Sequence, residues 1–103
     1  MRSILTDWAK QQIRQTAQYI RKEFGKKRCD VFMHEVRQAR RLIEAHPNAG
    51  SAESLLSDLP KLYRSYVMNR YNKMVYRVEG DIIYIVDFWD VRRDPRMLVS
   101  QVN

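Results

Sequence analysis

The sequence is poor in the features that secreted and membrane-spanning proteins depend on. Its one cysteine, Cys29, cannot form an internal disulfide, and no apolar run approaches the roughly 20 residues that a helix needs to cross a bilayer. Met1 and Arg2 lead into no apolar segment of the signal-peptide type. We therefore expect a cytoplasmic protein with no membrane partner, in which Cys29 is buried as a small apolar side chain.

The common signatures of cofactor-dependent chemistry are also missing. The sequence contains no glycine-rich phosphate loop, no Cys/His spacing typical of a metal site and no Ser-His-Asp signature. His34 and His46 lie outside the region in which basic residues are concentrated, so we interpret both as structural or solvent-exposed groups. We accordingly expect no metal and no small-molecule cofactor.

Basic residues outnumber acidic ones by 19 to 12, which gives a formal net charge of +7. The excess is concentrated, because residues 61–78 contain five basic residues and no acidic one. Such a chain attracts anionic partners, either nucleic acid or an acidic polypeptide, and charge alone does not choose between them. With 103 residues, of which 45% are hydrophobic, the chain can bury one modest core, so we predict a single domain spanning residues 1–103.

Two amphipathic helices are predicted in the first half of the chain. Thr6 or Asp7 can cap the first helix, whose apolar residues recur every three or four positions until Gly25. The second helix has the same periodicity and ends before Pro47. Because glycine commonly ends helices, Gly25 between the two predicts a helical hairpin.

The second half of the chain has the composition of loops and strands. Residues 46–60 predict a loop with one helical turn near residues 53–56, and residues 2–5 could add a short edge strand. Three segments rich in Tyr, Val and Ile predict an antiparallel meander, namely residues 62–68, 71–78 and 81–89. The predicted fold class is α+β, with an N-terminal helical hairpin packed on one face of a small antiparallel sheet in the order β-α-α-β-β-β.

A two-residue turn at Asn69-Arg70 would sort the strand side chains between the two faces of this sheet. The face that covers the helices would receive Tyr63, Val67, Met74, Tyr76, Val78, Ile83 and Ile85. The open face would receive Arg64, Tyr66, Lys73, Arg77, Tyr84 and Phe88. Cations interleaved with aromatic rings suit phosphates and stacked bases, although solvation of an open face accounts equally well for any single cation.

A series of short segments carries a resemblance to a known family. DWAKQQIRQTAQYIRKEFG is followed by HPNAG, LLSDLP, LYRSY, NKMVYRVEGDIIYIVDFWD and RRDP. In this order they resemble the toxins of bacterial type II toxin–antitoxin systems, the RelE/ParE family, also called plasmid stabilisation proteins. The match spans nearly the whole chain. It implies a cognate antitoxin partner, normally an acidic or amphipathic segment that folds across the toxin's sheet and helices.

The family divides by target, so the resemblance leaves the function open. ParE-like members inhibit DNA gyrase by binding, which requires no chemistry of the toxin, whereas RelE-like members cut messenger RNA in the ribosomal decoding site. The RRDP ending and the HPNAG loop are closer to ParE-like members, which is the function we expect. A third interpretation is an inactive or purely nucleic-acid-binding relative, which the predicted basic face permits.

The resemblance also implies site residues. A RelE-like, metal-independent endoribonuclease would use Arg64, Lys73 and Arg93 as catalytic cations that stabilise the extra negative charge on the phosphate. The set that binds the target would comprise Arg64, Tyr66, Lys73, Arg77, Arg92 and Arg93. Arg92 and Arg93 would stand at the end of the last strand, because Pro95 cannot continue the ladder. RNA-cleaving members often carry a C-terminal Tyr or His for acid–base work where this chain reads DPRMLVSQVN, so enzyme activity stays open.

Overall fold

The structure of the protein is a computed structural model that describes residues 1–90. It contains the predicted helices and strands. The elements in chain order are β1 (Arg2–Leu5), α1 (Asp7–Phe24), α2 (Lys26–Ala45), β2 (Ser51–Ala52), a 3-10 turn (Ser54–Leu56), β3 (Arg64–Val67), β4 (Asn72–Glu79) and β5 (Ile82–Asp90). The helical turn predicted in the central loop is thus confirmed. The described residues contain no helix that is long and apolar enough to cross a membrane.

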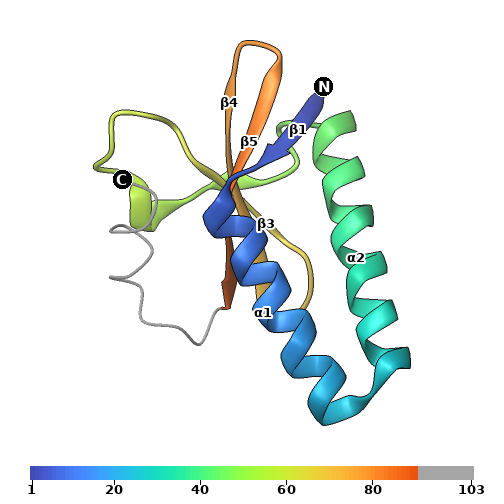
Figure 1. The fold of residues 1–103 in the computed structure, drawn as a ribbon. Helices are drawn as coiled ribbons and strands as arrows, with labels where there is room; N and C mark the ends of the chain where they lie inside the picture. The colour runs from blue at the N-terminus through green and yellow to red at the C-terminus, as the bar shows by residue number, and fades with distance from the viewer. Residues whose placement is uncertain (91–103) are drawn as a thin grey trace.

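The first helix of the hairpin begins and ends as its capping residues predict. The Thr6 hydroxyl accepts a hydrogen bond from the Ala9 amide, which satisfies one of the unpaired donors at the start of α1. Gly25 separates the helices with a φ of 93°, a conformation that residues with a side chain rarely adopt. α1 and α2 therefore lie side by side as an antiparallel pair, which Figure 1 shows clearly.

The strands form one sheet in the order β1-β5-β4-β3-β2. β3, β4 and β5 form the predicted antiparallel meander, and the edge strand predicted at residues 2–5 is confirmed as β1. The sheet is mixed, however, because β1 pairs with β5 in parallel. Parallel neighbours need a long crossover connection, and the chain between Leu5 and Ile82 supplies it.

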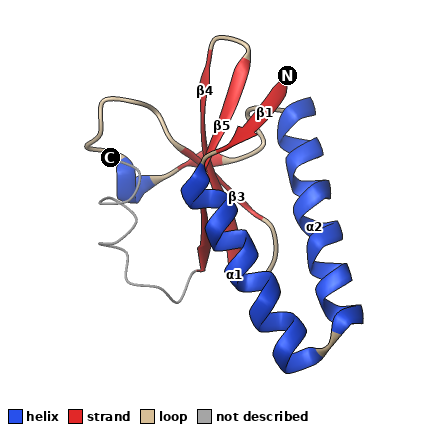
Figure 2. Ribbon diagram, viewed as in Figure 1, coloured by secondary structure: helices blue, strands red, loops and turns tan. Residues whose placement is uncertain are grey.

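Both faces of the sheet are covered, and each carries its own apolar cluster. α1 and α2 pack on one face, while the segment between α2 and β3 lies on the other (Figures 1 and 2). The helix-side cluster contains Ala9, Ile13, Phe32, Val36, Ala39, Ile43, Met74, Tyr76, Ile83, Ile85 and Phe88. The far-side cluster contains Leu56, Tyr63, Val75, Val86 and Trp89. The prediction of a sheet with one open face was therefore wrong.

The predicted register of the first strand pair was wrong by one residue. Tyr66 pairs with Met74 and Arg64 pairs with Tyr76, instead of Lys73 and Val75. The cause is the turn, in which the Asn69 side chain accepts hydrogen bonds from the amides of Tyr71 and Asn72 and so extends the loop beyond two residues. A slip of one residue exchanges the two faces of β3 relative to β4.

An irregularity in the second strand pair changes the faces again. Val75 pairs with Asp87 and Tyr76 with Ile85, so Val86 has no direct partner and forms a bulge. As a result Phe88, predicted on the open face, lies on the helix side, where its ring meets that of Phe32 edge to face at 5.6 Å. After the bulge, Phe88 therefore belongs to the helix-side cluster and Trp89 to the far-side cluster.

Candidate functional site

Arg64 does not lie on the face predicted for it. It pairs directly with Tyr76, whose side chain belongs to the helix-side cluster, and directly paired residues share a face. Its guanidinium donates a hydrogen bond of 2.9 Å to the carbonyl oxygen of Gly50. Arg64 therefore holds the loop that follows α2 and is only partly exposed.

The HPNAG segment owes its conformation to the same group of residues. The Tyr76 hydroxyl donates to the Pro47 carbonyl oxygen at 2.6 Å and accepts from the Gly50 amide at 2.9 Å. Two backbone groups of the loop are thereby satisfied by one buried side chain. This segment, which contributed to the family resemblance, has a structural role in the fold.

Lys73 and Arg77 do lie on the far face, as predicted, but carboxylates accompany both. Lys73 forms an ion pair with Glu53, whose side chain is 7% exposed, and the lysine side chain itself is 15% exposed. Arg77 lies 3.3 Å from Glu79 and stacks over the Tyr84 ring at 4.6 Å. Hydrogen bonds from Lys61 and then Arg77 lower the pKa of Glu79. The predicted face without carboxylates was wrong because Glu53 comes from a distant segment.

The residues predicted to bind a target are therefore divided. Arg64 and Tyr66 lie on the helix side of the sheet, whereas Lys73 and Arg77 lie on the far side. Arg92 and Arg93 lie outside the described residues. Within residues 1–90 the predicted cations form no single cluster.

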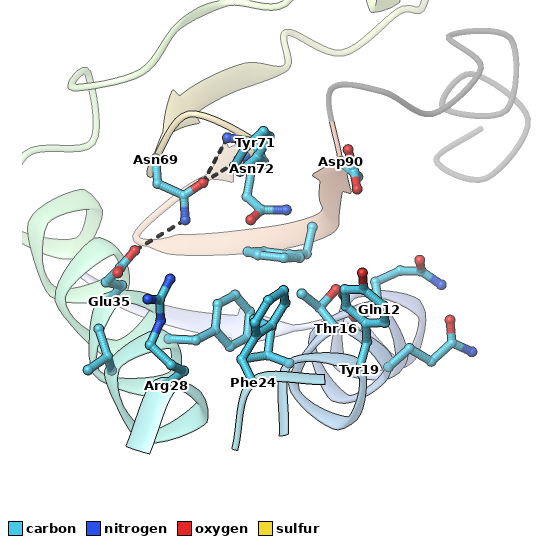
Figure 3. A pocket seen from close by; sticks show the side chains of 15 residues that line it. Gln12, Thr16, Tyr19, Phe24, Arg28, Glu35, Asn69, Tyr71, Asn72 and Asp90 are labelled. Carbon is cyan, nitrogen blue, oxygen red and sulfur yellow. Dashed lines mark hydrogen bonds between the residues drawn. The ribbon is translucent and has the colours of Figure 1, made fainter. Parts of the chain in front are cut away.

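A hollow in the described part of the chain lies elsewhere, between the helical hairpin, the start of β4 and the end of β5. This cleft has a volume of about 1140 Å³. Figure 3 shows side chains from α1, α2 and the β3–β4 turn facing it. Its lining comprises Gln12, Gln15, Thr16, Tyr19, Ile20, Phe24, Arg28, Val31, Phe32, Glu35, Asn69, Tyr71, Asn72, Phe88 and Asp90.

Four large apolar or aromatic side chains of the cleft are exposed. Tyr19 is 57% exposed, Phe24 60%, Val31 50% and Tyr71 46%. The rings of Tyr19 and Phe24 meet edge to face with their centroids 6.3 Å apart. A contiguous exposed apolar surface of this kind is typical of a binding site for another macromolecule.

Polar groups border this apolar surface. The Asn69 amide donates to the Glu35 carboxylate at 3.1 Å, which ties the β3–β4 turn to α2 (Figure 3). Arg28 faces the cleft from α2, one turn before Val31 and Phe32. An apolar centre with a charged border is the usual composition of a protein interface.

The sequence contained a signal for this cleft that the helical pattern did not use. Tyr19 lies off the predicted apolar stripe of the first helix, and Val31 lies off that of the second. The first stripe comprises Ala9, Ile13, Ala17, Ile20 and Phe24, and the second comprises Cys29, Phe32, Val36, Ala39 and Ile43. A large apolar residue outside the buried stripe of an amphipathic helix needs a second apolar environment.

The described residues contain no group of three His, Cys, Asp or Glu side chains that could hold a metal ion.

Comparison with known proteins supports the fold. No protein-family model matches this chain, and no curated protein matches it. Among solved structures, a chain of the "Chromosomal ParDE TA system from P. aeruginosa" has a similar backbone, with a TM-score of 0.72 and 17% sequence identity over 88% of this chain and 96% of that chain. The α+β fold predicted from the sequence is confirmed, and it is a fold that this chain shares with a component of a ParDE toxin–antitoxin system.

Proposed function

We propose that this chain is a ParE-like toxin of a type II toxin–antitoxin pair, which binds DNA gyrase and is neutralised by a cognate antitoxin. One observation carries the proposal: a chain with the backbone of a ParDE component has an exposed apolar cleft along its helical hairpin. An antitoxin segment with one apolar face would cover Tyr19, Phe24 and Val31. Cytoplasmic location belongs to the same proposal, because gyrase acts on DNA inside the cell.

The arrangement of the cations supports inhibition by binding over RNA cleavage. Stabilisation of a phosphate transition state requires cations that converge on one position. Arg64 and Lys73 lie on opposite faces of the sheet, and Glu53 already neutralises Lys73. A gyrase inhibitor has no such requirement, since it needs only a surface that fits its target.

The test compares two targets with one preparation of the full chain. Purified protein is added to DNA gyrase with relaxed plasmid, and in parallel to a cell-free translation reaction in which the 5′ ends of a defined messenger RNA are mapped by primer extension. We expect loss of supercoiling and an intact message. Ribosome-dependent cuts at codon positions would overturn the proposal in favour of a RelE-like endoribonuclease. Salt-sensitive RNA binding without either activity would indicate an inactive, nucleic-acid-binding relative.

A further inference from the structure

The segment that covers the far face of the sheet is held at both ends by ion pairs to the same strand. We call residues 53–62 the strap. Near its start Glu53 pairs with Lys73, and near its end Lys61 lies 2.5 Å from Glu79, so both contacts are made to β4. Between them Leu56, 2% exposed, packs into the far-side cluster.

The Glu53 contact differs from an ordinary surface ion pair. Lys61 and Glu79 are 51% and 42% exposed, whereas Lys73 and Glu53 are only 15% and 7% exposed. A charged pair that is largely removed from water stays only where each charge has its counterpart, because burial of an isolated charge is costly. Lys73 therefore defines a position that an anion must occupy when the far face is covered.

A second polar group on the same face as Lys73 has no hydrogen-bond partner among residues 1–90. Ser65 is 8% exposed, and its hydroxyl has no hydrogen-bond partner within the described residues. Ser65 pairs with Val75, two residues beyond Lys73, so the hydroxyl and the lysine lie on the same face. Buried hydroxyls without a partner are uncommon in folded proteins. The far face thus has a buried hydroxyl that the strap does not satisfy.

The surroundings favour a carboxylate on a peptide over a nucleic acid. Polyphosphate chains are bound by rows of cations, but Arg77, the next cation on this face, is already engaged by Glu79 and Tyr84. In this structure the carboxylate of Glu53 pairs with Lys73, and Leu56, three residues later, fills the apolar part of the site. A peptide with an acidic residue three positions before an apolar one reproduces both contacts.

We propose that the far face is a second binding surface, for an acidic peptide segment of a partner protein, and that the strap occupies it as an internal competitor. The partner's carboxylate would pair with Lys73 and use the Ser65 hydroxyl, and its apolar residue would replace Leu56. A tethered competitor acts at an effective concentration of about millimolar, so the strap weakens binding of any segment supplied from outside. This inference is independent of the cleft and of gyrase, since it concerns the opposite face.

A peptide copied from the strap itself provides the probe. A fluorescent peptide ESLLSDLP, the sequence of residues 53–60, is titrated with the full chain and followed by anisotropy. We expect Glu53→Gln to bind the peptide at least about tenfold more tightly than the unsubstituted chain, because its own strap no longer competes for Lys73. The double variant Glu53→Gln, Lys73→Met should lose that gain. A control peptide with Gln in place of its Glu should bind weakly both to Glu53→Gln and to the unsubstituted chain.

Each remaining outcome would overturn the proposal. Equal affinity of the unsubstituted chain and Glu53→Gln would mean that the strap does not compete, and a gain insensitive to Lys73→Met would place the peptide elsewhere. A gain for a short single-stranded RNA instead of the peptide would assign the surface to nucleic acid. If Glu53→Gln does not fold, hydrogen exchange on the unsubstituted chain decides: saturating peptide should accelerate exchange of the Leu56 and Leu59 amides, and unchanged rates would contradict displacement of the strap.

Discussion

At the scale of single residues, Gly50 lies where the loop after α2 passes closest to the sheet. A Cβ atom built on Gly50 would lie 2.7 Å from the Ser65 carbonyl oxygen and 2.8 Å from the Tyr76 hydroxyl. Neither group is free to move, because Ser65 belongs to β3 and Tyr76 is fully buried. Glycine is thus required at this position because the loop and the sheet approach each other too closely to leave room for a side chain.

Gly50→Ala should therefore destabilise the fold. The added methyl group forces the loop away from Tyr76, and overpacking of this kind costs about 1 to 3 kcal/mol in free energy of unfolding. Urea denaturation of the two proteins measures the difference. Ala49→Ser, at an exposed neighbouring position, is the matched control and should be nearly neutral; an equal loss in both would refute the close-contact explanation.

The pKa of Glu79 is a second residue-scale property that can be tested. Hydrogen bonds from Lys61 and Arg77 hold it below its ordinary value of 4.5. A carboxyl whose pKa is lowered by folding stabilises the folded state above its unfolded pKa, and this contribution is lost as the pH falls through the folded value. The stabilisation should accordingly be present at neutral pH and disappear in the acidic range below 4.5.

Titration of the carboxyl groups by NMR checks this directly. Lys61→Gln should raise the pKa of Glu79 towards its ordinary value, because the largest cause of the lowering is removed. Lys26→Gln provides the control, since Lys26 lowers the pKa of Asp30 on α2 and is not among the causes for Glu79. A Glu79 titration that is the same in Lys61→Gln and in the unsubstituted chain would exclude the ion pair in solution.

At the scale of elements, Thr6 joins the helical layer to the sheet. Its hydroxyl accepts from the Ala9 amide at 3.2 Å and donates to the Val86 carbonyl oxygen at 3.3 Å, while its own amide donates to the Ile85 carbonyl oxygen. One side chain thus caps α1 and fixes its start against the bulge in β5. The helix cap and the tertiary contact depend on the same oxygen.

Thr6→Ala should lower the free energy of unfolding by about 1 to 2 kcal/mol, in the range of a lost N-cap. Thr6→Ser keeps the hydroxyl and should recover most of this loss. Thermal or chemical denaturation of the three proteins gives the comparison. If serine were as destabilising as alanine, the methyl group of Thr6 and not its hydroxyl would be the stabilising part.

The helices and strands were easier to predict from the sequence than the way in which the strands pair and the side chains meet. Helix ends at Thr6 and Gly25 follow from capping residues that are local in the chain, and so does the loop at Pro47. The faces of β3 depended on whether Asn69 would lengthen a turn by accepting two amides, which no periodicity encodes. The pairing of Glu53 with Lys73 joins segments 20 residues apart, so it was invisible in a search for charge runs.

At the scale of the whole molecule, the sheet separates two kinds of surface. The cleft on the helix side combines exposed apolar residues with a polar border, and the far side carries ion pairs and a buried apolar cluster under the strap. The candidate site inferred from the sequence fell on strands whose cations proved to be divided between these sides. The cleft escaped prediction because it is assembled from two helices and a turn.

Substitution in the cleft should affect binding without affecting folding. Phe24→Ser combined with Val31→Ser removes two exposed apolar contacts, and we expect the proposed antitoxin to bind at least about tenfold more weakly, since each anchor of an interface contributes on the order of 1 kcal/mol or more. Copurification of coexpressed proteins and calorimetry measure the loss. Leu42→Ser, on the same helix as Val31 and 38% exposed, is the control outside both the cleft and the strap and should leave binding intact. Normal binding by the cleft variant would remove this surface from consideration.

The parallel pairing of β1 with β5 has a consequence for synthesis. Residues 2–5 find their partner only in residues 82–85, and the Thr6 hydroxyl reaches a carbonyl oxygen 80 positions further along. A nascent chain therefore makes its helices early but cannot complete the sheet until β5 has left the ribosome exit tunnel. Contacts so distant in sequence form late and slow folding. If the protein is the toxin we propose, the folded, active form cannot exist until residues 82–90 have been synthesised, which leaves an interval in which a partner made beforehand can meet the unfinished chain.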